Sequence, residues 1–360
     1  MKLTKFFALA LAALAIVGCE PTTGNDDQKP TGDAVLTANN NSVEVNTPIS
    51  FTVTASDGAD LTAEAIIYDK SHDYAVVENP YTPTMDGEYE FYAVIGNIIT
   101  PSIKVNVVPT VPALPEDAQP ENTSFNHRIL LVDHTGNTCG YCPQMMAALK
   151  EVSETGDYHS KYYEAMAHTY SSGDPAYSGA ANVVSGHHGV SAYPTLTYNF
   201  YHGTTSSYNA AHIMGQIDAL WRAEGAEAGI AAAATLASTS VIVNTEVKAA
   251  VTNDYHVTAW LLEDGIYAKQ TNATEEWMNT HDNAIRQRVT SDDITGVDLG
   301  TIAAGETAST ALTLKIIGNK WVRENLKVMV IVSAKNEKGK YEVANVAICP
   351  MDDVVTYDYK

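Results

Sequence analysis

The sequence predicts a multidomain protein in which a central α/β domain lies between two β-sandwiches. Residues 34–108 and 226–360 alternate apolar and polar side chains with a period of two, which is typical of strands with one buried face. Residues 122–225 instead combine buried-looking strands with helical runs, a pattern typical of an α/β domain. Four prolines within residues 109–121 predict an extended, semi-rigid linker that holds the first sandwich away from the central domain.

Residues 1–18 have the pattern of a lipoprotein signal peptide. Lysines near the start precede an apolar run that ends before Cys19, and the run is short for a membrane span of about 20 residues. Cleavage before Cys19 leaves its thiol to be acylated, so we expect a lipid anchor to the membrane there. Glu20 follows instead of Asp, which favours the outer membrane, on the periplasmic face or the cell surface. Residues 19–33 form a polar tether.

The composition restricts the partners of the exported chain. Its 360 residues carry a formal charge of -22, from 43 acidic and 21 basic residues, and such a surface repels nucleic acid. No calcium-loop motif is present, and we expect neither a metal nor another cofactor. Export places the cysteines where disulfides persist.

The first alternating region, residues 34–108, is interrupted by turn dipeptides such as Asp57-Gly58 and Asp86-Gly87. Tyr89 follows the second of these in a segment that resembles the tyrosine corner of immunoglobulin-like folds. The resemblance implies an immunoglobulin-like sandwich. Two roles remain open for it, a spacer and a module that binds carbohydrate or a partner.

The most informative motif is Cys139-Gly140-Tyr141-Cys142-Pro143, between an apolar strand at 129–133 and a helical run at 144–152. Two intervening residues in the first turn of a helix bring two sulfurs within bonding reach. The free N–H groups and the dipole at the helix start favour a thiolate, the reactive form of cysteine. We expect Cys139 to attack or be attacked, Cys142 to resolve the mixed disulfide, and the pair to be open to solvent.

Two residues outside the motif support redox chemistry. Asp133 ends the strand before the cysteines, where a carboxylate can move the proton of the second thiol. Pro194 follows an aromatic residue and opens an alternating run, which predicts a cis peptide bond. With a further strand at 162–168, the order of these elements resembles the thioredoxin superfamily.

The resemblance implies a thioredoxin-like domain over 122–225 with the catalytic residues Cys139, Cys142, Asp133 and Pro194. It implies substrate contacts at Tyr141, Tyr193 and Thr195. The Gly140-Tyr141 dipeptide is similar to that of bacterial periplasmic disulfide isomerases. The chain departs from the family in an extra helical run near 177–184 and in a short or missing strand after Gly203.

The final region, residues 226–360, carries a distinctive segment with His281, Asn283 and Arg286. These residues are expected to fix a loop by hydrogen bonds, or else to bind an anion. The whole order, from Asn122 to the C-terminus, resembles the twenty-eight-kilodalton outer-membrane protein family of Bacteroidota. That family is defined by sequence and location more than by a settled activity.

The leading functional prediction is thiol–disulfide exchange on exported proteins that contain thiols or disulfides. Whether the chain is an oxidoreductase or isomerase, or no enzyme, stays open. The alternative is a surface-displayed binding or adhesion lipoprotein that uses the thioredoxin-like domain as a scaffold. A third interpretation joins the thiols to His134, His187 or His188 in a metal site. Cys349 is interpreted as a small buried hydrophobe, or alternatively as a resolving thiol.

Overall fold

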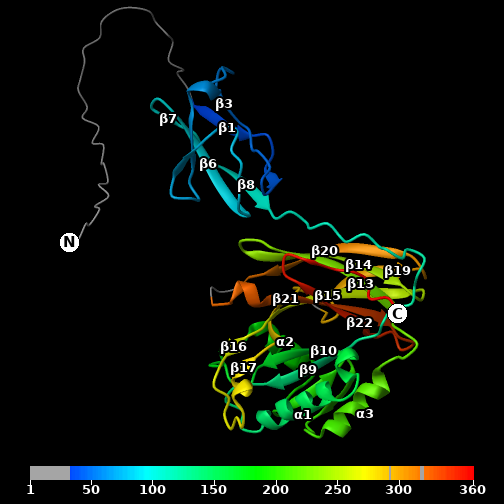
Figure 1. Ribbon diagram of the computed structural model, residues 1–360. Coiled ribbons are helices and arrows are strands. Elements are labelled where there is room, and N and C mark those ends of the chain that lie inside the picture. Colours follow the sequence, from blue (N-terminus) through cyan, green and yellow to red (C-terminus); the bar gives the residue numbers. More distant parts are fainter. Residues whose placement is uncertain (1–32, 292, 317–319) are drawn as a thin grey trace, which may run out of the picture.

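The computed structural model describes residues 33–291, 293–316 and 320–360, arranged as Figure 1 shows. The predicted signal peptide, Cys19 and all but the last residue of the predicted tether lie outside the described residues. Within the described part, none of the helices has the length and apolar character needed to cross a bilayer. The chain is a mostly-β protein of several sheets, one of which is a mixed sheet covered by helices.

Residues 34–108 form two facing sheets around one core. The strands are β1 (Ala34–Ala38), β2 (Ser42–Glu44), β3 (Phe51–Ala55), β4 (Ile66–Asp69), β5 (Ala75–Val77), β6 (Gly87–Ile95), β7 (Ile98–Ile99) and β8 (Ile103–Val108). β1 pairs with β3, and the second sheet has the order β2-β8-β6-β4-β5 with β7 beside β6. The buried hydroxyl of Tyr89 donates to the carbonyl of Met85 at 2.9 Å, which is the hydrogen bond of a tyrosine corner.

The central region alternates strands and helices. Its elements are β9 (Ile129–Thr135), α1 (Cys142–Glu154), β10 (Tyr162–His168), α2 (Gly179–His187), β11 (Thr195–Tyr198), β12 (His202–Thr205) and α3 (Ala210–Leu220). Local sequence explains the helix starts. Pro143 lies in the first turn of α1, where its missing N–H costs nothing, and Ser178 caps α2 by accepting the N–H of Ala181 at 3.0 Å. The predicted extra helix is α2, and the predicted short strand is β12.

The C-terminal region is built from strands. They are β13 (Ala228–Leu236), β14 (Ser240–Ala249), β15 (Asn253–Glu263), β16 (Ile266–Tyr267), β17 (Thr280–His281), β18 (Ala284–Arg288), β19 (Val297–Ile302), β20 (Thr307–Lys315), β21 (Leu326–Lys335), β22 (Tyr341–Pro350) and β23 (Val354–Val355). β20-β14-β13-β23 form a four-stranded sheet, and its core is shared with β15, β21 and β22.

The mixed sheet crosses the predicted boundary at residues 225 and 226. Its order is β12-β11-β9-β10-β18-β15-β21-β22, with β19 also paired to β15. The crossing point is the parallel pair β10–β18, where Met166 lies opposite Ala284. Helices α1 and α3 cover one face of the central strands, because their apolar residues pack with Ile129 and Leu131. The opposite face, with α2, belongs to a core that continues under β15 and β21.

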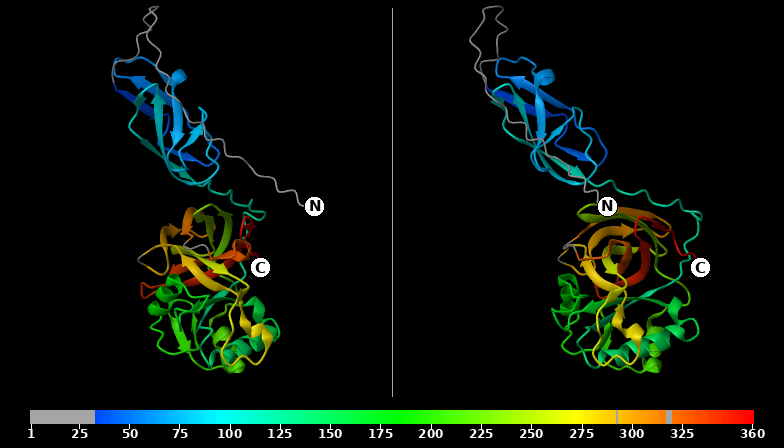
Figure 2. Two further views of the ribbon diagram at one scale, coloured as in Figure 1. Left: turned by 90° about the vertical axis from the view of Figure 1, so that its left-hand side faces the viewer. Right: turned by 60° about the vertical axis from the view of Figure 1, so that its left-hand side comes forward.

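The linker is attached to the C-terminal sheet instead of spanning free space. The side-chain amide of Asn244 donates to the carbonyl of Pro112 at 2.9 Å, and the buried ammonium of Lys248 pairs with Asp117 at 3.0 Å. Figure 2 shows residues 34–108 at one end of the molecule and the helices at the other, with the C-terminal strands between them.

Candidate functional site

The two cysteines of the motif form a disulfide. Cys142 is the first residue of α1, and Cys139 lies in the turn before it. The S–S distance is 2.09 Å and the Cα atoms are 5.5 Å apart, so the predicted proximity of the sulfurs is confirmed. The two cysteines do not share a helical turn, because Cys139 precedes the helix that begins at Cys142.

The pair is not open to solvent. Cys139 is 2% exposed and Cys142 is 0% exposed, so the expectation of an accessible disulfide is wrong for this conformation. The physical reason is a long connection from the C-terminal strands. Residues 265–283, which include β16 and β17, lie against the motif and are called here the covering segment.

The covering segment binds the backbone of the CxxC loop through polar side chains and one amide. The hydrogen bonds are Thr271 N to Asn137 O at 2.7 Å, Gln270 Nε2 to Cys139 O at 2.9 Å and Asn272 Nδ2 to Gly140 O at 3.1 Å. Gln270 is itself buried, and its Oε1 has no partner among the described residues. A buried amide that is only partly satisfied weakens the attachment of the covering segment.

The histidine-to-arginine segment anchors the end of the covering segment, which confirms the expectation that it fixes a loop. A ring nitrogen of His281 lies 3.1 Å from the carbonyl of Ala268, and the carbonyl of Asn283 accepts the N–H of Met166 at 2.8 Å. The guanidinium of Arg286 pairs with Glu263 at 2.9 Å, and both side chains are almost fully buried.

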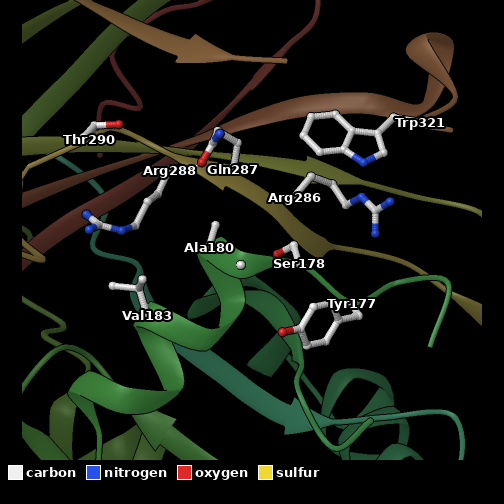
Figure 3. Close-up of a pocket in the computed structure, with 10 residues that line it drawn as sticks. Tyr177, Ser178, Ala180, Val183, Arg286, Gln287, Arg288, Thr290 and Trp321 are labelled. Atoms are coloured by element: carbon white, nitrogen blue, oxygen red, sulfur yellow. Dashed lines mark hydrogen bonds between the residues drawn. The ribbon is translucent and has the colours of Figure 1, made fainter. Parts of the chain in front are cut away.

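Arg286 also borders a cavity of about 490 Å³ at the start of α2, shown in Figure 3. Its guanidinium faces the ring of Trp321 at 5.3 Å and donates to the carbonyl of Pro175 at 3.0 Å, while Arg288 extends in the other direction. The charge of Arg286 is therefore already matched by Glu263 inside the protein, and the alternative of an anion site at Arg286 gains no support.

Asp133 is buried at 0% exposure, and neither carboxyl oxygen has a hydrogen-bond partner among the described residues. Side chains alternate along β9, so Asp133 shares the face of Ile129 and Leu131, the face that α1 covers. Because β9 leads directly into the CxxC loop and α1 packs on this face, Asp133 lies on the covered face near the end of β9 that joins the loop. Burial, and then the nearby charge of Glu164, raise the pKa of Asp133 well above its usual value.

Pro194 follows a cis peptide bond, as predicted. The next residue, Thr195, opens β11 and lies opposite His134 of β9. Pro194 is therefore located at the end of the sheet from which the CxxC loop departs.

The three predicted substrate-binding residues have different surroundings. Tyr141 is 65% exposed and lines a groove of about 460 Å³ between α1 and the covering segment. Tyr193 instead uses its hydroxyl in a 3.0 Å hydrogen bond with Thr169. The buried hydroxyl of Thr195 donates to the carbonyl of Ala192 at 2.9 Å. Of the three side chains, that of Tyr141 is the most exposed.

Two of the three histidines considered as metal ligands, His134 and His187, serve as local hydrogen-bonding groups, whereas the buried Nε2 of His188 has no partner among the described residues. His134 contacts the hydroxyls of Ser185 at 2.8 Å and Thr197 at 3.0 Å, and burial lowers its pKa to about 3. A ring nitrogen of His187 lies 3.2 Å from the carbonyl of Phe200. Across the described ranges, no group of three or more His, Cys, Asp or Glu residues is placed to hold a metal.

Cys349 lies in β22 and is fully buried in the core between the two C-terminal sheets. Burial raises the pKa of its thiol to about 11. These surroundings agree with a small buried hydrophobe, since the Cys139–Cys142 disulfide lies elsewhere, at the start of α1.

Sequence reasoning missed two parts of the site, Glu164 and the covering segment. Glu164 lies in the strand at 162–168, which was predicted only as a structural element, and burial raises the pKa of Glu164 to about 7. A signal for the covering segment was present, because a connection as long as residues 264–283 with little regular structure is unusual and commonly functional.

Part of this fold is similar to a solved structure. HBP35 of Porphyromonas gingivalis aligns with a TM-score of 0.51 and 16% sequence identity, over 64% of this chain and 77% of that chain, which indicates a similar fold. Domains 4–9 of the surface layer protein SbsC align with a TM-score of only 0.19 and 9% identity, over 89% of this chain and 51% of that chain. No curated protein matches the sequence.

Residues 182–351 match the model of the outer membrane protein Omp28 family. The match begins in α2, includes β11 and β12, and continues through the covering segment to β22, so it covers the strands on both sides of the β10–β18 junction. The part of the chain at residues 182–351 therefore belongs to the Omp28 outer membrane protein family.

Proposed function

We propose that residues 122–225 act as a thioredoxin-like module that exchanges disulfides with exported proteins when the covering segment moves away from Cys139. The observation that carries the proposal is Asp133, a buried carboxyl without a partner on the sheet face beneath α1. Burying an unpaired carboxyl is costly, and perturbed acids of this kind concentrate at functional sites. A disulfide that only staples a helix start needs no such group.

The chemistry that Asp133 supplies is proton transfer. A client thiolate attacks Cys139 Sγ, the Cys139–Cys142 bond breaks, and Cys142 leaves as a thiolate that takes a proton from Asp133. A second client thiolate then displaces Cys139 and forms the client disulfide. Two electrons pass from the client dithiol to the pair, and the reverse sequence reduces a client.

Before exchange can begin, a client thiolate must gain access to Cys139. With Cys139 at 2% exposure, an attacking thiolate cannot reach it along a straight path while the covering segment is in place. The groove beside the exposed Tyr141 offers a client a first contact next to the hydrogen bond of Asn272 with Gly140. We therefore expect exchange to be slow at rest and faster when a client or a reductant displaces residues 270–272.

Two measurements test the proposal: the reduction potential of the cysteine pair and the trapping of mixed disulfides with clients. The reduction potential of the pair is measured in glutathione buffers, and Cys142→Ser is expressed in the native envelope to retain mixed disulfides at Cys139. A potential well above about −300 mV together with trapped clients supports exchange. A potential below that value with no trapped client removes the proposal. Cys349→Ser serves as the matched control, because its thiol lies in another core.

The second candidate is an anchored binding lipoprotein whose disulfide is a structural staple, and the burial of both sulfurs favours it. Charge argues against nucleic acid as its partner. Protein from reducing and oxidising media distinguishes the two candidates. A staple is expected to raise the melting temperature without changing any transfer of disulfides to a reduced client.

We also propose that Cys19 carries the lipid anchor, in the outer membrane, with the chain on the periplasmic face or the cell surface. The support is the signal pattern that ends at Cys19 and the outer membrane family. Palmitate labelling that is lost in Cys19→Ala tests the anchor. Protease treatment of intact cells tests the face, because release of the folded chain requires surface exposure.

We further propose that residues 34–108 form an immunoglobulin-like sandwich and that residues 226–360 contain a second sandwich. The hydrogen bond of Tyr89 with Met85 supports an immunoglobulin-like sandwich for residues 34–108. The core shared by the two C-terminal sheets supports a second sandwich within residues 226–360.

A further inference from the structure

Glu164 lies on the same sheet face as Asp133 in the neighbouring strand. In the parallel pair β9–β10, Leu131 is opposite Glu164 and Asp133 is opposite Met166. The two carboxyl groups are therefore diagonal neighbours, with Cα atoms about 8 Å apart by the geometry of a sheet. Two side chains at this spacing can meet directly or through one water molecule.

Glu164 also connects the interior with a cavity. A cavity of about 500 Å³ lies between α1 and the covering segment, and Glu164 lines it together with Lys150, Trp277 and Asp282. Its Oε1 is buried without a hydrogen-bond partner, while the residue as a whole remains partly exposed. The carboxyl therefore lies at the boundary between the buried sheet face and the water of the cavity.

The charges around Glu164 leave it without a paired cation among the described residues. The groups that face it from the packed elements are Asp133 of β9, Asp282 before β18, Lys150 of α1 and Lys327 of β21. The ammonium of Lys150 lies 4.9 Å from the ring of Trp277, and Lys327 pairs with Asp264 at 2.6 Å. Burial first, and Asp282 second, raise the pKa of Glu164 to about 7 against the opposing effect of Lys327.

We propose that Glu164 transfers the proton of Asp133 to and from the water of this cavity. The inference rests on the proposed exchange function. When Cys142 leaves as a thiolate and takes the proton of Asp133, the Asp133 carboxylate recovers a proton from Glu164, which recovers one from water. No electron moves in these steps. Glu164 acts through Asp133, so it supports the reaction without touching the sulfurs.

The experiment measures reduction of the disulfide in the full chain by dithiothreitol between pH 6 and 9, corrected for the ionised fraction of the reductant. In the wild type the corrected rate is expected to fall above pH 7, where Glu164 has lost its proton. In Glu164→Gln the rate is expected to be about tenfold lower at pH 6 and independent of pH, because Glu164 no longer returns a proton to Asp133 as Asp133 gives up its own. Glu164→Asp keeps a carboxyl and is expected to retain the fall.

Glu151→Gln, at an exposed carboxylate of α1, is the matched control and is expected to follow the wild type. A Glu164→Gln profile that coincides with the wild-type profile overturns the proposal. Dithiothreitol reduces the pair without a client protein. If the Glu164 variants behave as expected but no client exchanges disulfides with the chain, only the proposed function is refuted. If the wild-type disulfide is not reduced at any pH in this range, the proposal is tested by following the ionisation of the Glu164 carboxyl with carbon-13 NMR. A carboxyl that ionises near pH 4.5 overturns the proton route, and one that ionises near pH 7 supports it.

Discussion

Asp133 combines a cost to stability with the proposed role in proton transfer. It is a carboxyl on a fully buried strand, without a hydrogen bond from any described residue, directly before the CxxC loop. Burial and Glu164 raise its pKa above 3.8, so the folded chain holds this proton at pH values where the unfolded chain has lost it. The unfolded state then binds fewer protons, and the stability of the fold decreases as pH rises above about 4.

Asp133→Asn is therefore expected to stabilise the protein while it impairs exchange. The free energy of unfolding at pH 7 is expected to rise by about 1–2 kcal/mol, because the amide does not have to take up a proton on folding. At pH 3.5, where the acid is mostly neutral in both states, little gain is expected. Urea unfolding at the two pH values measures the difference. An equal change at both would show that Asp133 is not held protonated in the fold.

Among the elements of the fold, the covering segment makes the contacts that bear most directly on the CxxC loop. It places Gln270 and Asn272 on the backbone carbonyls of the CxxC loop, and it is anchored at its far end by His281. The anchor contacts lie in the part of the chain that matches the Omp28 family, whereas the disulfide lies outside the matched residues. The segment that contacts the CxxC loop is thus encoded far from the two cysteines.

Gln270→Ala is expected to accelerate reduction of the disulfide by a small thiol about fivefold to tenfold. The substitution removes the 2.9 Å hydrogen bond to Cys139 and also the unsatisfied Oε1, and about 1 kcal/mol of lost attachment shifts the open population by this factor. Stopped-flow reduction with excess dithiothreitol measures it. Glu276→Gln, in the same segment but outside these hydrogen bonds, is the control. Identical rates in all three proteins would mean that residues 270–272 do not limit access.

Sequence reasoning identified the local elements because their signals are local. The strand at 162–168 coincides with β10, the helical run at 144–152 lies within α1, and the aromatic residue before Pro194 indicated the cis bond. The pairing of β10 with β18 has no such signal, since it joins Met166 to Ala284 across more than a hundred residues and β18 looks like any short strand. The burial of the disulfide follows from the same long-range docking, which explains why an open site was expected.

On the scale of the whole molecule, the mixed sheet joins the disulfide region to the C-terminal strands. The buried Trp260 of β15 packs near Phe200, with ring centroids 6.1 Å apart, and both belong to the core that includes α2. The hydroxyl of Ser178, which caps α2, also donates to the carbonyl of Ile285 in β18 at 2.5 Å. Shared backbone pairing and a shared core favour cooperative unfolding of residues 122–360.

Arg286→Met tests this cooperativity, because it breaks the buried pair with Glu263 at the junction. Leaving Glu263 unpaired is expected to cost about 3–5 kcal/mol, and Arg286→Met with Glu263→Leu is expected to restore most of that loss. Hydrogen exchange in rising denaturant is the measurement. Peptides from α1 and from β21 are expected to lose protection together and earlier than in the wild type, whereas peptides from β6 keep their midpoint. If α1 retained wild-type protection while β21 lost it, the helices would belong to an independently folding domain. The covering segment would then be able to separate from that domain without unfolding it.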